Sequence, residues 1–173
     1  MGRVWFIATA ALLAHTAWAE EGQPQVSVKA DGFVLGHILI PADKAEVQHL
    51  LSDAVKSSHL SSDVYDANAQ KDGQCDIVVR KVRGMWSPIT YRARRCPTAT
   101  GWVEHLIESD TVSGYQMEWT LKPMQAGTRV EYRIKTEVNY PVPVSWVQQE
   151  TKRSVAKMLK NLLSKFARKK KKK

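Results

Sequence analysis

The sequence lacks the motifs that usually identify a chemical activity. It has no Cys/His spacing of the kind that holds zinc, no glycine-rich phosphate loop and no nucleophile elbow. Histidine is sparse, and the four that follow the first nineteen residues are scattered along the chain: His37, His49, His59 and His105. We therefore expect no metal and no cofactor.

Cysteine is scarce, with only Cys75 and Cys96 present. They flank a predicted hairpin, in which strands 74–83 and 88–95 are joined by the four residues 84–87. If that loop sets the register, paired residues have numbers that sum to 171, as 75 and 96 do. Cysteines directly opposite each other on antiparallel strands lie within bridging reach. We predict a structural disulfide rather than a reactive thiol pair.

The sequence also lacks an apolar run that would span a bilayer comfortably, since the run Val4–Ala14 is too short. Arg3 precedes this run, and Ala17-Trp18-Ala19 follows it as a small-x-small cleavage site. We predict that residues 1–19 are a cleaved signal peptide. The mature protein would then be periplasmic or secreted, which is where disulfides persist.

Acidic residues are absent from the C-terminal part, although the whole chain has 26 basic and 17 acidic residues and a net charge of +9. Residues 152–173 hold eleven Lys or Arg, whereas residues 20–151 have a net charge of −3. We expect the last six residues to be disordered, because like charges repel. They are either a solubilising end or a contact for an anionic membrane surface, and the predicted membrane-binding residues are Arg168, Lys169, Lys170, Lys171, Lys172 and Lys173.

Hydrophobic periodicity predicts an α+β domain over residues 20–167, with a curved antiparallel sheet of about six strands wrapped around a long C-terminal helix. The first strand is expected at 26–40, a short amphipathic helix at 42–57 and a loop or helical turn at 63–72. Further strands are expected at 74–83, 88–95, 101–109, 114–122 and 128–140, and the long helix at 143–166.

The last two predicted strands alternate strictly between apolar and polar residues, which indicates one buried and one solvated face. The final helix has an apolar stripe at three- and four-residue steps. This helix either caps an ordinary sheet or encloses a cavity with it. For the cavity, the predicted ligand-binding residues are Tyr91, Tyr115, Met117, Trp119, Tyr132, Ile134, Thr136, Val155, Met158, Leu159 and Leu162.

Three segments resemble the helix-grip superfamily of START-like, polyketide cyclase/dehydrase and birch-pollen-allergen-type proteins (SRPBCC). They are the strand-to-helix passage 38–53, the pair of stretches 119–123 and 127–132, and the final helix after Pro141-Val142-Pro143. The resemblance spans residues 26–166. It implies a curved sheet that grips the C-terminal helix, with a hydrophobic ligand between them. Many members bind lipids, sterols, quinones or polyketides, but most bacterial members are cytoplasmic, and an exported chain with a disulfide departs from that habit.

Three functions are compatible with these features. The first is an exported protein that binds or carries a hydrophobic small molecule, with a lipid as the leading ligand. The second is an exported cyclase- or aromatase-like enzyme, in which an inward Tyr132, Tyr91 or His105 acts as an acid or base. The third is a ligand-free adaptor that binds anionic surfaces. We expect a monomer. We also expect no nucleic-acid partner, because an exported protein meets few nucleic acids and the sequence has no stacking motif.

Overall fold

A computed structural model of the chain describes residues 22–84 and 87–170, with the side chains of 168–170 excepted. The predicted signal peptide and the last three residues of the predicted tail lie outside these ranges. None of the helices within them is long and apolar enough to cross a membrane.

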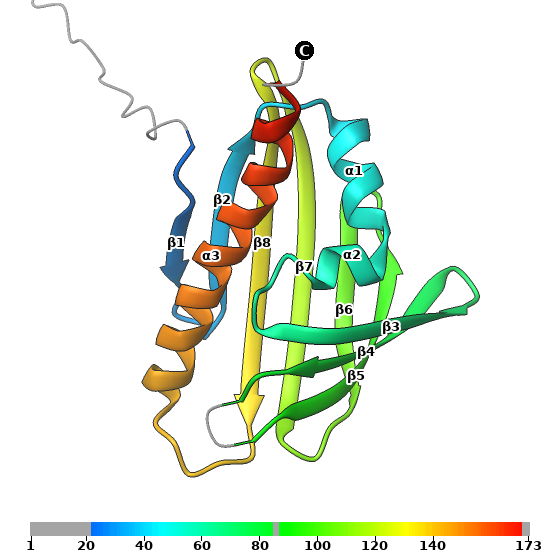
Figure 1. The fold of residues 1–173 in the computed structure, drawn as a ribbon. Coiled ribbons are helices and arrows are strands. Elements are labelled where there is room, and N and C mark those ends of the chain that lie inside the picture. The colour runs from blue at the N-terminus through cyan, green and yellow to red at the C-terminus, as the bar shows by residue number, and fades with distance from the viewer. Residues whose placement is uncertain (1–21, 85–86, 171–173) are drawn as a thin grey trace, which may run out of the picture.

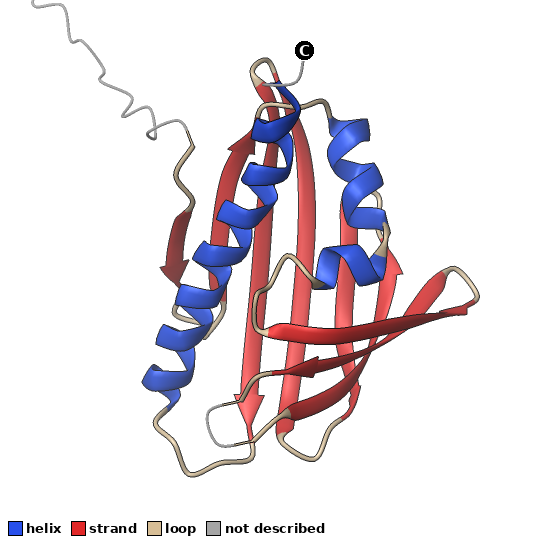
Figure 2. Ribbon diagram, viewed as in Figure 1, coloured by secondary structure: helices blue, strands red, loops and turns tan. Residues whose placement is uncertain are grey.

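The described chain is an α+β fold in which one curved antiparallel sheet lies against a long C-terminal helix, as predicted (Figure 1). All three helices lie on the same face of the sheet (Figure 2). The sheet has eight strands in the order β1-β2-β8-β7-β6-β5-β4-β3. The strands are β1 (Gln25–Val28), β2 (Val34–Ile40), β3 (Val64–Asp72), β4 (Cys75–Val82), β5 (Ile89–Pro97), β6 (Gly101–Glu108), β7 (Val112–Met124) and β8 (Gly127–Val138), and the helices are α1 (Lys44–Ser52), α2 (Ala54–Ser58) and α3 (Val144–Lys170).

Helix α3 packs on β1, β2 and β8 through the predicted apolar stripe. Leu159 and Leu162 in this stripe are fully buried. The helix approaches β2 closely at Gly36, where a Cβ would lie 2.6 Å from Val155 and 2.8 Å from Leu159. Glycine is therefore the residue that lets helix and sheet meet here. The helix ends four residues beyond the predicted Phe166, so its backbone includes residues 168–170 of the predicted tail.

The predicted first strand, 26–40, is two strands joined by a tight turn. Gly32 has a φ of +84°, and the Asp31 side chain accepts a hydrogen bond of 3.1 Å from the backbone of Phe33. An Asp-Gly pair with a positive φ is a turn signal that outweighs the surrounding β propensity. The predicted helix 42–57 is likewise two helices, because Asp53 ends α1 and caps the first turn of α2 through the backbone N–H groups of Val55 and Lys56.

The prediction of a loop or helical turn at 63–72 was wrong, because this segment is strand β3, paired with β4 along its length. It is an edge strand, and most of its residues are exposed. A strand with two solvated faces carries no hydrophobic alternation to reveal it. The turn at Gly32 and the addition of β3 explain why the sheet has eight strands rather than about six.

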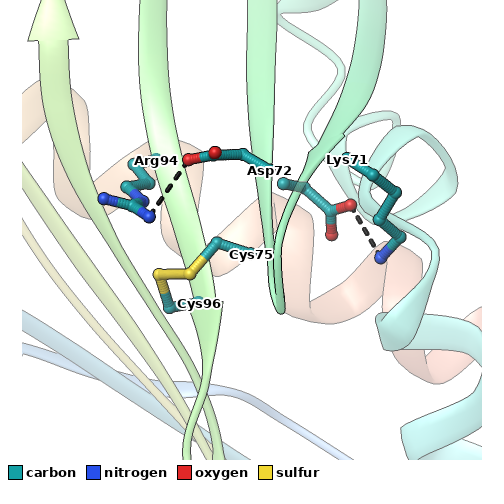
Figure 3. The surroundings of a disulfide bond; sticks show 6 residues. Lys71, Asp72, Cys75, Arg94 and Cys96 are labelled. Atoms are coloured by element: carbon teal, nitrogen blue, oxygen red, sulfur yellow. Dashed lines mark ion pairs between the residues drawn. A yellow bond between two sulfur atoms is a disulfide. The ribbon is translucent and has the colours of Figure 1, made fainter.

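The disulfide prediction is confirmed. Strands β4 and β5 pair Asp76 with Arg95, which is the predicted register, and Cys75 is bonded to Cys96 with 4.3 Å between their Cα atoms. Figure 3 shows the bond beside two ion pairs, from Arg94 to Asp72 at 3.0 Å and from Lys71 to Asp76 at 2.8 Å. These contacts tie together the end of the long β3–β4 hairpin.

Candidate functional site: a cavity between α3 and the sheet

A cavity of about 590 Å³ lies between the first half of α3 and the sheet. Its walls come from α2, strands β3, β4, β5, β7 and β8, and the segment that leads from β8 into α3. The volume is within the range of small-molecule sites. In Figure 1, β3, β4 and β5 curl forward from the sheet, opposite the start of α3.

Nine of the eleven predicted ligand-binding residues line this cavity: Tyr91, Tyr115, Met117, Trp119, Tyr132, Ile134, Thr136, Val155 and Met158. The other two, Leu159 and Leu162, lie instead in the solid core toward the C-terminal end of α3. The stripe is continuous along the helix, but only its first half faces the open space. That the nine residues contact a ligand stays a prediction.

One part of the cavity wall is aromatic and carries hydroxyl groups. The rings of Tyr91 and Tyr115 are 5.1 Å apart, and those of Trp119 and Tyr132 are 4.4 Å apart. The hydroxyl of Tyr115 lies 3.4 Å from an oxygen of the buried Glu104, to which it donates a hydrogen bond. The phenols thus bring hydroxyl groups to the part of the wall that also contains Met117, Trp119 and Ile134.

A buried ion pair contacts these tyrosines. Arg80 lines the cavity and donates two hydrogen bonds to Glu104, of 2.6 and 2.8 Å, in a bidentate pair. Its Nε donates a third, of 2.6 Å, to the hydroxyl of Ser58 in α2. Arg80 is 4% exposed and Glu104 is fully buried, so the pair lies in a low dielectric, where such bonds are strong but desolvation is costly.

A second buried arginine shares the same carboxylate. The Nε of Arg95 lies 3.4 Å from Glu104, and its Nη2 donates a hydrogen bond of 2.5 Å to the backbone oxygen of Leu51 at the end of α1. Positive charge is favourable at a helix C-terminus. Two arginines therefore share one glutamate, and the group carries one excess positive charge.

Arg80, Glu104 and Arg95 were not among the residues predicted from the sequence. A signal for Arg80 was available, since the register that predicted the disulfide also pairs Arg80 with the inward Tyr91. Arg95 likewise alternates with the buried Tyr91 and Ala93 along β5. A search for apolar alternation passes over such positions because it treats charge as a mark of the solvated face.

Burial raises the pKa of Tyr91, Tyr115 and Tyr132, because each phenolate would lose its hydration. For Arg80, burial alone would lower the pKa, but the charge of Glu104 outweighs it and holds the pKa well above its usual value. At neutral pH the three phenols are protonated and the guanidinium is charged. This part of the cavity wall therefore carries phenol and guanidinium donors, of which the Tyr115 hydroxyl and three N–H groups of Arg80 already donate within the protein.

His105 does not belong to the site. It is exposed and borders a separate surface depression, not the cavity, so it is not placed as the inward acid or base that the enzyme alternative considered. Its neighbour Glu104 points inward instead, as the alternation of a strand requires. Within residues 22–84 and 87–170, no cluster of His, Cys, Asp or Glu could hold a metal ion.

No family model matches the sequence, and no curated protein matches it. Solved structures do match the fold. A START superfamily protein from Mycobacterium smegmatis is 14% identical with a TM-score of 0.69, over 79% of this chain and 97% of that one. The Zhui aromatase/cyclase from Streptomyces sp. R1128 is 15% identical with a TM-score of 0.67, over 79% and 93%.

The human StAR-related lipid transfer protein 5 is 13% identical with a TM-score of 0.67, over 87% of this chain and 85% of that one. At this level of identity the similarity establishes the fold and nothing finer. The chain has the START-like helix-grip fold.

Proposed function

We propose that this protein binds a hydrophobic small molecule with one polar end in the cavity, and carries it outside the cytoplasm. The observation that supports this most directly is the cavity itself, whose lining joins apolar residues to a polar group of Arg80, Tyr91 and Tyr115. Apolar pockets with a few placed polar groups are the usual form of a ligand site. The similar folds include a lipid transfer protein and an aromatase/cyclase.

The cavity volume limits the ligand. At about 590 Å³ the cavity lies in the lower part of the range of about 300–1,000 Å³ that small-molecule sites occupy. A single-chain lipid or a polycyclic molecule has this size. A phospholipid with two long acyl chains is much larger, so we propose a single-chain or polycyclic ligand.

Binding is better supported than catalysis, because the carboxylates near the cavity already have partners. Glu104 pairs with Arg80, Asp63 accepts a hydrogen bond of 2.9 Å from Ser154, and Glu150 pairs with Arg153. None is placed as an unengaged base. An enzyme of the cyclase or aromatase type is the second candidate, favoured by the convergence of Tyr91, Tyr115 and Tyr132.

Mass spectrometry of solvent extracts from the purified mature protein tests the proposal. We expect one class of single-chain or polycyclic amphipathic compound, bound near one molecule per chain and recovered unchanged after incubation. Conversion of the compound during incubation would favour the enzyme. An empty protein that also takes up no added lipid would favour the ligand-free adaptor and contradict the proposal.

The proposed location is the periplasm or the exterior. The disulfide supports it, because such bonds persist in oxidising compartments. The intact mass of protein recovered from outside the cytoplasm should correspond to a chain that begins at Glu20 with both cysteines oxidised. Retention of residues 1–19 in that protein would contradict the signal-peptide prediction.

We also propose that residues 168–173 attract the protein to anionic membranes. Basic residues near an anionic leaflet contribute about 1 kcal/mol each. The binding free energy of six such residues is reduced by the entropy that the tail loses on ordering. The remainder is sufficient for weak and reversible docking. Deleting residues 168–173 should weaken binding to anionic vesicles and leave ligand uptake in solution unchanged. A deletion without effect on vesicle binding would make the tail a solubilising end only.

A further inference from the structure

The buried charges beside the cavity do not balance. Arg80 and Arg95 are each at most 4% exposed, and they share the fully buried carboxylate of Glu104. Two guanidinium groups and one carboxylate leave one positive charge, because arginine stays protonated in proteins. An uncompensated buried charge is costly. A further negative charge close to this group would therefore stabilise it.

Arg95 is the less well compensated of the two arginines. Its Nε lies 3.4 Å from Glu104 and makes no hydrogen bond within the described chain. The ring of Trp102, 4.8 Å from the guanidinium carbon, and the backbone oxygens of Leu51 and Ser52 stabilise the cation, but they carry only partial charges. Burial lowers the pKa of Arg95, as expected for a cation whose partners do not offset its loss of hydration.

The other acidic groups nearby already have partners. Asp76, which lies opposite Arg95 in the register of β4 and β5, forms an ion pair of 2.8 Å with Lys71. Asp63 and Glu150 line the cavity, and each is bonded to a side chain of α3. Among the described residues, no ion pair joins these three carboxylates to either buried arginine.

We propose that the polar end of the ligand carries a single negative charge, as a carboxylate does, and that Arg95 selects for this charge from outside the cavity. Arg95 is not among the described residues that line the cavity, whereas Arg80 is. Because the two arginines share Glu104, Arg80 faces the cavity only partly neutralised. This inference names the chemistry of the ligand and therefore rests on the proposed function.

Arg80 can bind a carboxylate without losing Glu104. A guanidinium has five N–H groups, and three of those of Arg80 donate to Glu104 and Ser58. Tyr91, whose ring centre is 5.8 Å from the guanidinium carbon of Arg80, brings a hydroxyl to the same part of the lining. A carboxylate matches the single excess charge, whereas a phosphate monoester carries about −1.5 to −2 charges at neutral pH and would exceed it.

The first test compares dodecanoic acid, 1-dodecanol and dodecylamine, which differ in the charge of the end group at about pH 8. Their affinities are measured by displacement of a neutral fluorescent probe, N-phenyl-1-naphthylamine, from the mature protein with its disulfide intact. We expect the acid to bind at least about tenfold more tightly than the alcohol, because hydrogen bonds to a charged acceptor are about twice as strong as neutral ones. The amine should bind more weakly than the alcohol.

Equal affinities for the acid and the alcohol would overturn this inference and leave the proposed function intact. A protein that takes up neither the probe nor any of the three compounds would contradict the proposed function itself. The two failures are therefore distinguishable.

The second test asks whether Arg95 sets the preference. Arg95→Met should lower the ratio of acid to alcohol affinity to near one, because it leaves Arg80 and Glu104 as a neutral pair. Arg95→Lys keeps the charge and should keep most of the preference. The control is Arg92→Met, which makes the same loss of charge at an exposed position of β5, where Arg92 pairs with Glu108. Its ratio should equal that of the wild type.

Thermal unfolding verifies that each variant is folded. If Arg95→Met does not fold, Arg95→Gln makes the same change in charge with a side chain that can still donate to the carbonyl groups of α1. A purely structural role for Arg95 would weaken the acid and the alcohol alike, so an unchanged ratio in a folded Arg95→Met or Arg95→Gln protein would overturn the assignment. An equal fall of the ratio in Arg92→Met would also overturn it, because the preference would then follow the net charge of the protein.

Discussion

At the residue scale, the main feature is a charged group inside the protein. Arg80, Arg95 and Glu104 are all at most 4% exposed, and the two arginines depend on one carboxylate. Replacing such a group with apolar residues is often neutral, whereas removing one partner strands the others. The group therefore makes the interior beside the cavity sensitive to single substitutions.

Glu104→Gln should destabilise the protein by about 3–5 kcal/mol, because it leaves two buried guanidinium groups without a counter-charge. The control is Glu108→Gln on the same strand, which removes an exposed ion pair with Arg92 and should cost less than about 1 kcal/mol. Urea denaturation measures both. Similar losses for the two variants would show that Arg80 and Arg95 are satisfied without Glu104.

The buried tyrosines predict a loss of stability at high pH. Their pKa values are raised in the folded state, so the folded protein keeps these protons while the unfolded chain releases them above its pKa of about 10. Stability from this source is fully present below pH about 10 and falls as the pH rises through the folded pKa values. Tyr115→Phe should flatten the fall of the unfolding midpoint above that pH. An unchanged slope would contradict the burial of this phenol.

At the element scale, the β3–β4 hairpin depends on contacts at its end. The strands extend away from the helices, most of β3 is exposed, and the disulfide joins β4 to β5 near the tip (Figures 1 and 3). A long hairpin with little apolar burial has low local stability. The disulfide supplies constraint where packing does not.

The double variant Cys75→Ser/Cys96→Ser should lose about 3 kcal/mol of stability, the value that the chain-entropy model gives for a loop of roughly this length. Reduction of the wild type should lower its free energy of unfolding, measured by urea denaturation, by the same amount. Reduction of the variant should leave its free energy of unfolding unchanged. A variant as stable as the oxidised wild type would mean that the hairpin is rigid without the disulfide and that the bond adds no stability.

The elements also show how far the sequence could be read. Strands β7 and β8 were predictable because one face is buried and the other solvated, so the apolar or polar type of each residue indicates the face on which it lies. Strand β3 was not, because it is an edge with polar residues on both faces. The separation of β1 from β2 depended on one glycine. The apolar lining of the cavity could be predicted from alternation, but the inward positions of Arg80 and Glu104 could not. A charged side chain is stable in the interior only when a partner from another strand pairs with it, and the alternation within one strand does not show that partner.

At the scale of the whole molecule, α3 divides the interior into two parts. Its C-terminal half packs against the sheet as solid core, with Leu159, Leu162 and Phe166 buried. Its N-terminal half borders the cavity, through Val147, Val155 and Met158. The packed half stabilises the fold, so the other half can leave space for a ligand without losing the structure.

The central claim is that this space holds a hydrophobic ligand, and a cavity-filling variant tests it most directly. Ile134 lines the cavity, and the next residue on β8, Lys135, does not line it. The measurement is titration of the wild type, Ile134→Trp and Lys135→Trp with a fluorescent single-chain fatty acid, with thermal unfolding to verify the fold. We predict that the wild type and Lys135→Trp bind the probe, and that Ile134→Trp binds at least about tenfold more weakly, because the indole occupies the ligand's volume. A folded Ile134→Trp protein that binds as tightly as the wild type would place the ligand outside the cavity and contradict the account.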